Sequence, residues 1–408
     1  MSYNRKERIV VSGLGVISSL GFSWQEFWKN IIAGKSGISQ IAAFDTSKHD
    51  RQFAGEIKDF DPARFMDKRK AMKMGRGSQL AIAASSFALK DACFNLNGDK
   101  CKRIGVCIGT TMGEQQVMEK MNEQCIPHKM SFKYEALSAI SYPAFSLANQ
   151  VSLYFKMGRE TVVFSNACAS GNHAVARSLD LIRLGKADYM LAGGSDALSR
   201  IAFTGFSRMF AMAPEKCQPF DKSRKGMILG EGAGILFLET LESALKRNAH
   251  IYAEVLGYGL SCDAIHMTDP AADGVTKAVQ KSLKHSDINP DDVDYFSAHG
   301  TGTKENDSTE SKVIHNVFGK RAQEIPVSSI KSMLGHTMGA ASALETIACC
   351  LAIDKGEIPP TINYETPDPE CPVYCVPNKS IKRQVKVALN NSQAFGGNNA
   401  AVVLKKVI

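Results

Sequence analysis

The order of strand-like and helix-like segments in the first part of the chain is repeated after residue 250. A β-branched run at 161–164 leads through small residues into a helical pattern, and the segment 326–352 follows the same plan. Strands that alternate with helices predict mainly parallel strands buried between helices. Neither part has a linker long or polar enough for an independent domain. We therefore expect an α/β protein of two duplicated halves, residues 1–250 and 251–408.

The composition argues against several classes of function. Hydrophobic residues make up 44% of the chain and charged residues 22%, as in ordinary soluble globular proteins. The net charge of +8 is not gathered into Lys/Arg runs with interleaved aromatics, so we expect no nucleic-acid partner, whereas an acidic protein or substrate would fit. No stretch has the length and apolar character of a membrane-spanning helix, so we expect no membrane association. Eleven cysteines without a spaced framework indicate a reducing, cytoplasmic location rather than disulfides.

Cys168 is the candidate nucleophile because it stands where the strand-like run at 161–164 passes into the helical pattern. Unpaired N–H groups and the positive end of the helix dipole at such a junction favour the thiolate form. The small residues at 169–171 leave room for a substrate. The alternative is that Cys168, like many free cysteines, is a small buried hydrophobic residue.

Two histidines occupy related positions in the second half. His336 stands at the strand-to-helix junction that corresponds to that of Cys168, and His299 ends another strand-like run. Either histidine alone could be structural, but all three side chains converge on one cleft if the halves pack around a twofold axis.

A thiol and two neutral imidazoles suit carbon–carbon bond formation on thioesters. The thiol of Cys168 would carry an acyl group. The imidazoles would donate hydrogen bonds to the thioester carbonyl of a malonyl group, which stabilises the enolate left when carbon dioxide departs. The glycine-rich turn at 395–399 and the Cys168 N–H are candidate donors to the developing oxyanion.

The remaining cysteines do not predict a metal site. Cys371 and Cys375 flank Pro-Val-Tyr without a second pair, so we do not expect zinc there. Cys349 and Cys350 lie in an apolar helical pattern and are expected in the core. We therefore predict that the protein uses no metal.

Four glycine-containing motifs follow one another along the chain. They are Asn166-Ala-Cys168-Ala-Ser-Gly, His299-Gly-Thr-Gly-Thr, Lys331-Ser-Met-Leu-Gly-His336 and Phe395-Gly-Gly-Asn-Asn. In this order, and over nearly the whole chain, they resemble the signatures of the elongating β-ketoacyl-(acyl carrier protein) synthases of the thiolase superfamily. The resemblance implies a five-layered αβαβα sandwich of two duplicated halves. It also implies an acyltransferase that condenses malonyl-(acyl carrier protein) with a cysteine-bound acyl chain and releases carbon dioxide.

The same resemblance implies roles for individual residues. The phosphopantetheine arm would arrive with the acyl carrier protein, so no cofactor bound by the enzyme itself is expected. The residues are Cys168 as the acylated nucleophile, His299 and His336 in decarboxylation and condensation, Lys331 with its partner Glu345 in ordering the site, Phe395 with Gly396 and Gly397 in gating and oxyanion binding, and Thr301 and Thr303 in holding the arm.

Finer details resemble one branch of the family. The motifs that begin at His299, Ser329 and Thr366 are similar to ketosynthase-alpha subunits of type II polyketide synthases, which pair with a chain-length-factor paralogue that lacks the cysteine. This chain keeps Cys168 and would be the catalytic partner. The alternatives are a homodimeric fatty-acid elongation synthase of the 3-oxoacyl-(acyl carrier protein) synthase II type, a non-catalytic scaffold subunit, and a cysteine hydrolase. Departures from the family pattern border the expected acyl pocket at Gln393, Ala394 and Asn398.

A cluster of basic residues is the candidate docking face for the carrier protein. Carrier proteins of this family are acidic, and the net charge of +8 suits such a partner. The alternative is an ordinary solvated helix surface. The residues expected at this face are Lys68, Arg69 and Lys73, together with Arg208.

Overall fold

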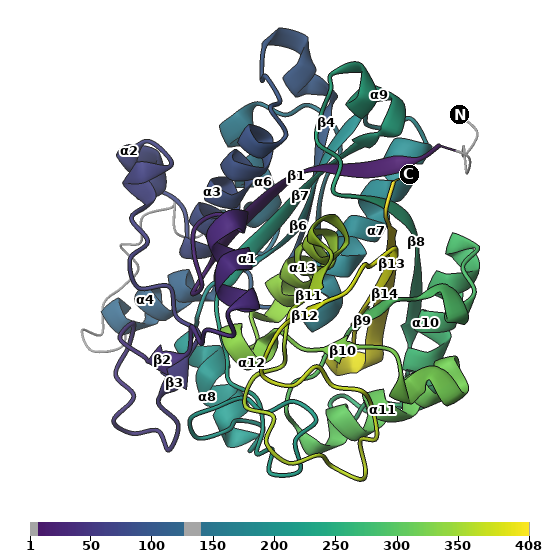
Figure 1. The fold of residues 1–408 in the computed structure, drawn as a ribbon. Helices are drawn as coiled ribbons and strands as arrows, with labels where there is room; N and C mark the ends of the chain where they lie inside the picture. The colour runs from purple at the N-terminus through teal and green to yellow at the C-terminus, as the bar shows by residue number, and fades with distance from the viewer. Residues whose placement is uncertain (1–6, 126–139, 408) are drawn as a thin grey trace.

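Ten strands form one mixed sheet in the computed structural model, which describes residues 7–125 and 140–407 (Figure 1). The order across the sheet is β10-β9-β13-β14-β8-β1-β7-β6-β4-β5. One half holds β1 (Ile9–Ser18), β7 (Gly232–Thr240), β6 (Tyr189–Asp196), β4 (Ile104–Gly109) and β5 (Thr161–Phe164). The other holds β8 (Ala253–Cys262), β14 (Asn398–Lys405), β13 (Val387–Ser392), β9 (Tyr295–Ser297) and β10 (Val327–Ser328).

The order of strands is the same in both halves when each is followed outward from the centre. The halves meet where β1 pairs with β8 in an antiparallel ladder that includes Val10 opposite Glu254. In each half, the central strand pairs with a strand late in that half, β7 or β14, and the two parallel outer strands come last. The repeat predicted from the sequence is therefore present. The predicted boundary at residue 250 falls between α9 (Leu241–Lys246) and β8.

The expectation of mainly parallel strands is wrong. Only β4 with β5 and β6, and β9 with β10 and β13, pair in parallel. The other pairs, β1 with β7 and β8, β6 with β7, and β14 with β8 and β13, are antiparallel. A short connection explains one of these pairs, β13 with β14, because a short turn reverses the chain whereas parallel neighbours need a long crossover. The turn at 393–397 joins β13 directly to β14.

Helices complete five layers, as the resemblance implied. The two halves of the sheet form two of these layers, a pair of central helices lies between them, and further helices cover each outer face. The two central helices contact strands of both halves and each other, and one of them is buried from Ala341 to Ile353, as a helix enclosed on all sides must be. The outer layers hold two helices on each side (Figure 1). The central helices are α7 (Ser170–Arg183) and α13 (Ala341–Lys355); the outer ones are α3 (Arg76–Asp91) and α6 (Ser146–Phe155) on one side, and α10 (Ala272–Ser286) and α11 (Lys304–Phe318) on the other.

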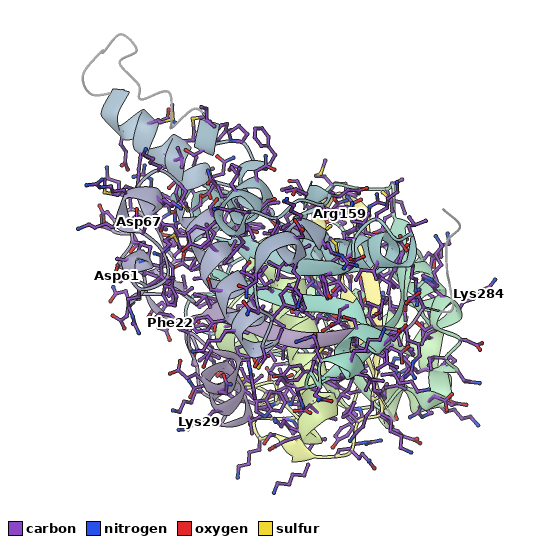
Figure 2. The ribbon with its side chains drawn as sticks, turned by 90° about the horizontal axis from the view of Figure 1, so that it is seen from above. Phe22, Lys29, Asp61, Asp67, Arg159 and Lys284 are labelled. Carbon is purple, nitrogen blue, oxygen red and sulfur yellow. The ribbon has the colours of Figure 1, made fainter. Side chains whose placement is uncertain are left out.

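Shorter elements surround the sandwich, and charged side chains such as Lys29, Asp67 and Lys284 extend from its periphery (Figure 2). Within the described residues, no helix is both long and apolar enough to cross a membrane. The shorter helices are α1 (Trp24–Ile32), α2 (Lys68–Ala71), α4 (Gln115–Cys125), α8 (Arg200–Arg208) and α12 (Lys331–Leu334), and the two small ribbons are β2 (Ser39–Gln40) with β3 (Phe53–Ala54) and β11 (Glu357–Ile358) with β12 (Ile381–Lys382).

The starts of α7 and α13 lie against each other, and this contact positions the site. A Cβ atom at Gly171 would lie 2.7 Å from the Ala343 nitrogen, so only glycine permits the approach. Buried polar groups tie the same region together, because the Asn172 N–H donates to Ser342 Oγ at 3.0 Å. The close contact brings the strand-to-helix junctions of the two halves to one place.

Candidate active site

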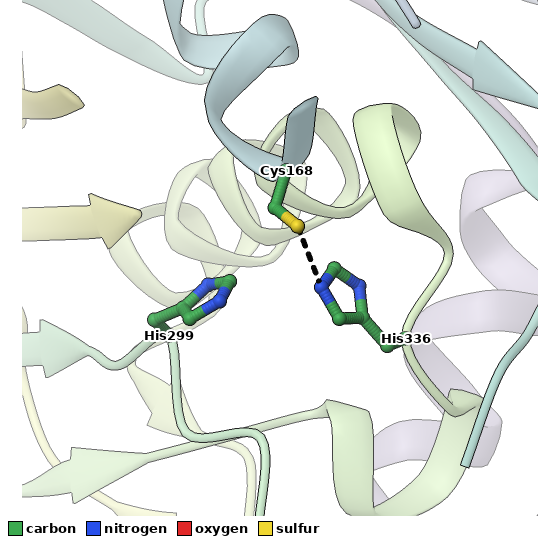
Figure 3. Close-up of side chains that lie close together, drawn as sticks. All are labelled: Cys168, His299 and His336. Atoms are coloured by element: carbon green, nitrogen blue, oxygen red, sulfur yellow. Dashed lines mark hydrogen bonds between the residues drawn. The ribbon is translucent and has the colours of Figure 1, made fainter. Parts of the chain in front are cut away.

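Cys168, His299 and His336 converge from three separate segments (Figure 3). Cys168 lies in the 3-10 turn Ala167–Ala169 that leads from β5 into α7, and His336 lies between α12 and α13. His299 follows β9. The sulfur and one ring nitrogen of each histidine lie within 4.8 Å of one another, and all three residues are buried. The predicted convergence is therefore present, in an arrangement of a thiol and two imidazoles that could also ligate a metal ion such as zinc.

The hydrogen bonds of His336 define its tautomer. The Met338 N–H donates to His336 Nδ1 at 3.1 Å, so in the neutral ring the proton is on Nε2. That nitrogen lies 3.0 Å from Cys168 Sγ. Burial, together with the Lys331 charge, lowers the pKa of His336 well below its usual value of 6.5. His336 is therefore a neutral N–H donor that faces the sulfur.

Lys331 gives His299 the same orientation. The buried ammonium donates to the His299 carbonyl at 2.6 Å and lies 3.3 Å from His299 Nδ1. An ammonium can only donate, so Nδ1 accepts and the ring proton is on Nε2. Glu345 pairs with the same ammonium, as predicted. Burial, then the charge of Lys331, lowers the pKa of His299 well below 6.5. The cluster thus holds a second neutral imidazole with its proton on Nε2.

The structure corrects the expectation that the resting thiol of Cys168 favours the thiolate. Burial raises the pKa of the Cys168 thiol to about 12, against the opposing charge of Lys331. Desolvation disfavours the charged form and outweighs the effects of the helix start. The resting cysteine is therefore neutral. The N–H of His336 and the charge of Lys331 are the groups placed to stabilise a thiolate as it forms or leaves.

A cavity of about 680 Å³ opens onto the three side chains. Phe395 lines it and lies against Phe206 of α8, with ring centroids 5.7 Å apart. Thr301 and Thr303 also line it, and their hydroxyl oxygens are 3.0 Å apart. Both predicted groups, the gate and the arm-holding threonines, thus border the space through which a substrate would reach Cys168.

The glycines after Phe395 shape the turn. Gly396 and Gly397 have φ values of +79° and +72°, where residues with a Cβ are strained. Their N–H groups donate to Met267 O at 2.7 Å and Ala394 O at 3.0 Å. Because these two donors are used within the protein, Phe395 N–H is the candidate oxyanion donor of this turn.

Two buried carboxylates that sequence reasoning missed hold the loop of His299. Glu310 accepts from the N–H groups of His299 and Gly300, both at 2.7 Å, and Asp307 accepts from Gly302 N–H at 3.2 Å. Burial raises the pKa of Glu310 to about 7. A signal was present, because the two acidic residues share a face of α11 with the buried Val313, at helical spacing.

A third buried carboxylate joins the two halves at the site. Asp196, at the end of β6, accepts from Thr111 N–H at 2.7 Å and from Gly339 N–H at 2.6 Å. Gly339 belongs to the turn that holds His336. Burial raises the pKa of Asp196 to about 6. Only a Ser-Asp pair after a strand marked this residue in the sequence, and that signal is weak.

The sequence at 199–226, with its many aromatic residues and methionines, predicts one long irregular loop, but this segment contains α8. Ser199 caps this helix, since its Oγ accepts from Ala202 N–H at 3.2 Å. The error arose because Gly205 and the aromatic residues weaken a helical pattern. The end of α8 places Phe206 in the cavity wall.

The predicted docking residues lie on separate elements. Lys68, Arg69 and Lys73 are exposed on and just after α2, whereas Arg208 is exposed at the end of α8, beside the cavity. Figure 2 places Asp67, the cap of α2, at the opposite side of the molecule from Lys284. Two exposed cations that line the cavity were missed in the sequence, namely Lys225 and Lys304.

Comparison with known proteins agrees with this geometry. The family model "Beta-ketoacyl synthase, N-terminal domain" matches residues 6–244, and "Beta-ketoacyl synthase, C-terminal domain" matches 252–365. The chain is 38% identical to 3-oxoacyl-(acyl-carrier-protein) synthase 2 of Synechocystis sp., over 100% of both chains. It is 40% identical to Nodulation protein E of Rhizobium meliloti, over 98% of this chain and 99% of that protein.

Solved structures are similar as well. The ishigamide ketosynthase/chain length factor structure superposes with a TM-score of 0.95 at 43% identity, covering 98% of this chain and 100% of that one. A type II polyketide synthase acyl carrier protein in complex with its ketosynthase, bound to the hexaketide, gives a TM-score of 0.88 at 34% identity, with 98% and 100% covered. The chain belongs to the beta-ketoacyl synthase family and is a condensing acyltransferase.

Proposed function

We propose that this chain is the ketosynthase-alpha subunit of a type II polyketide synthase. The observation that carries the chemistry is the 3.0 Å approach of His336 Nε2 to Cys168 Sγ, with His299 beside them. In the first step, Cys168 sulfur attacks the acyl thioester of the carrier. The bond from the acyl carbon to the carrier sulfur breaks, a bond to Cys168 forms, and the thiol proton ends on the released carrier thiol.

In the second step, a malonyl group on another carrier loses carbon dioxide. The electron pair of the broken carbon–carbon bond forms an enolate, whose oxygen accepts the N–H groups of His299 and His336. The enolate carbon attacks the acyl carbon, Cys168 leaves as a thiolate, and a proton taken up from solvent returns it to the resting thiol. N–H groups of Phe395 and Cys168 would bind the oxyanion formed in that attack.

The supporting residues have simpler roles in this proposal. Lys331 and Glu345 hold the ring of His299 with its Nε2 proton toward the substrate. Thr301 and Thr303 bind the phosphopantetheine arm, the only prosthetic group involved, which the carrier protein delivers. Phe395, with the turn at Gly396 and Gly397, moves when Cys168 becomes acylated.

The assignment to polyketide rather than fatty-acid synthesis rests on similarity. It is supported by the 43% identity to the ishigamide ketosynthase/chain length factor structure, and it makes a chain-length-factor paralogue the expected partner. A homodimeric fatty-acid synthase is the second candidate, because the 38% identical relative is a 3-oxoacyl-(acyl-carrier-protein) synthase 2. Both candidates place the protein in the cytoplasm, and in both the halves 1–250 and 251–408 act as one unit. The intact thiol and imidazoles disfavour a scaffold subunit.

Replacement of Cys168 tests the chemistry. Cys168→Ala should abolish transfer of an acyl group from the carrier, measured as the mass of the intact protein, and abolish the β-ketoacyl product. Cys93→Ala, a change at an exposed cysteine outside the cavity, is the matched control and should keep both activities. Product formation by the Cys168→Ala protein would contradict the mechanism. Thioester hydrolysis that needs no malonyl-carrier would indicate a hydrolase instead.

Co-purification distinguishes the two pathways. Expression together with a paralogue that lacks the cysteine should give a heterodimer, and mass analysis of its carrier-bound products should show an extended polyketide chain. Expression without the paralogue is the comparison. A stable, active homodimer that makes only single-step products would favour the fatty-acid assignment.

The docking face is part of the proposal and has its own test. We expect the exposed cations of α2, Lys68 and Arg69, with Lys73 and Arg208, to contact an acidic carrier protein. Lys68→Glu with Arg69→Glu should weaken carrier binding and flatten its salt dependence. Lys284→Glu, at the opposite side of the molecule, is the control (Figure 2). Equal binding by both variants would contradict this face.

A further inference from the structure

Gln393 carries a buried amide without a partner beside the nucleophile. It follows β13 directly and is 3% exposed. Neither its side-chain nitrogen nor its side-chain oxygen has a hydrogen-bond partner in the described part of the chain. The residue lines the same cavity as Cys168 and Phe395. Gln393 is therefore a residue of the cavity wall whose covered side-chain amide has no partner within the protein.

Its neighbours on β13 differ from it in part, because the side-chain oxygens of Asn390 and Asn391 also lack a partner in the described residues, but their side-chain nitrogens are bonded. The side-chain nitrogen of Asn390 donates to Asn172 Oδ1 at 3.1 Å, and that of Asn391 donates to Glu310 Oε1 at 2.7 Å. The Ser392 hydroxyl donates to the Cys168 carbonyl at 3.2 Å. Buried amides are nearly always bonded, because an unbonded one costs stability. Among the amides at 390–393, only that of Gln393 is unbonded at both its nitrogen and its oxygen, and this residue lines the cavity just after β13 ends, as expected for a residue whose partner is the substrate.

The position of Gln393 indicates which part of a substrate it would meet. Its neighbour Ser392 contacts the backbone of Cys168, and consecutive Cα atoms are about 3.8 Å apart. Gln393 thus lies near the thioester end of an acyl chain on Cys168 rather than near its far end. A carboxamide offers both donors and an acceptor, which match a hydroxyl or carbonyl oxygen on the first carbons of the chain.

We propose that Gln393 is a specificity-determining residue that hydrogen-bonds an oxygen substituent near the thioester of the Cys168-bound acyl chain. The inference rests on the proposed function and deepens it, because it names the substrate class as oxygenated acyl chains. A fully reduced chain would leave the amide buried and unbonded, and a site built to bond a substrate oxygen rejects an analogue that lacks it.

The test compares two acyl groups of equal length on the carrier protein, 3-hydroxyoctanoyl and octanoyl. The wild-type enzyme, with its native partner, should show the larger kcat/KM for the hydroxylated chain. Gln393→Met keeps the length of the side chain and removes its hydrogen bonding. It should lower the ratio of the two kcat/KM values by about tenfold, the order expected for one buried hydrogen bond. Gln323→Met, at an exposed glutamine outside the cavity, should leave the ratio unchanged.

Melting temperatures separate a substrate role from a structural one. Removing an unbonded amide should leave the Tm of Gln393→Met equal to or above that of the wild type, and Gln393→Leu serves if the first variant does not fold. An unchanged ratio, with or without a lower Tm, would overturn the inference. An equal fall in kcat/KM for both chains would also overturn it, since Gln393 would then contact the malonyl group or the arm. If neither acyl chain is transferred to Cys168 of the wild-type enzyme, the proposed function itself fails.

Discussion

Removing the ammonium of Lys331 should separate stability from catalysis. Lys331→Met keeps the length of the side chain but leaves the Glu345 carboxylate buried without its cation. Breaking a buried ion pair in this way costs about 3–5 kcal/mol of unfolding free energy. Part of this loss is offset because burial has already raised the pKa of Glu345 to about 7, so the carboxyl can take up a proton. The His299 ring also loses the donor at Nδ1 that keeps its proton on Nε2.

The loss of decarboxylation rate has a separate cause, and the substitution that restores stability should not restore it. Without its proton on Nε2, His299 no longer donates to the enolate, and losing one such donor costs about 10²–10³ in rate. Release of carbon dioxide from malonyl-carrier measures this step, and chemical denaturation measures stability. Adding Glu345→Gln to Lys331→Met should restore most of the stability and none of the rate. If the single variant decarboxylates at a rate within about threefold of the wild type, or the double variant recovers the rate, the argument from the tautomer is refuted.

Three further predictions follow from the same contacts. Because the pKa of His336 lies well below 6.5, protonation of its ring should slow decarboxylation only below pH 6.5, when a proton on Nδ1 breaks the bond from Met338 N–H. This step is separate from the titration of Glu310 and Glu345, whose pKa values lie at about 7, and a rate profile without a further fall below pH 6.5 would contradict it. The stability that the neutral His336 ring contributes is present above pH 6.5 and lost at lower pH. Asp196→Asn places an amide donor among N–H groups and should cost about 1–3 kcal/mol in chemical denaturation together with a slower rate, whereas unchanged stability would show that the carboxylate is dispensable. Gly171→Ala pushes a methyl group against Ala343 and should cost about 1–3 kcal/mol, measured in the same way, and a gain in stability would show that the two central helices can move apart.

Much of the architecture was predictable because it repeats. The junction at Cys168 and the one at His336 have the same local pattern, and a duplicated chain that packs on itself brings such points together. The four motifs then indicated the family, and the resemblance that they carry predicted Cys168 as the nucleophile and Glu345 as the partner of Lys331. Local sequence carries this information because glycines and small residues are required wherever two backbones approach closely. Gly171 is an example, since it lies directly against the backbone of α13.

The direction of the strands was not predictable in the same way. A strand pattern records burial and alternation but not which neighbour the strand pairs with, and the short turn at 393–397 reverses a chain that the repeat suggested would run parallel. The helix α8 was missed because Gly205 and the aromatic residues weaken its helical pattern, although the helix places Phe206 in the cavity wall.

The protonation of the site was decided by tertiary structure alone. The sequence by itself determined that a thiol, two imidazoles and a lysine belong to one centre. Only the folded chain shows that burial keeps the Cys168 thiol neutral, that Met338 N–H and Lys331 set the ring tautomers, and that the amide of Gln393 is left unbonded. These properties depend on solvent exclusion and on contacts between residues far apart in the chain, and no local pattern records either one.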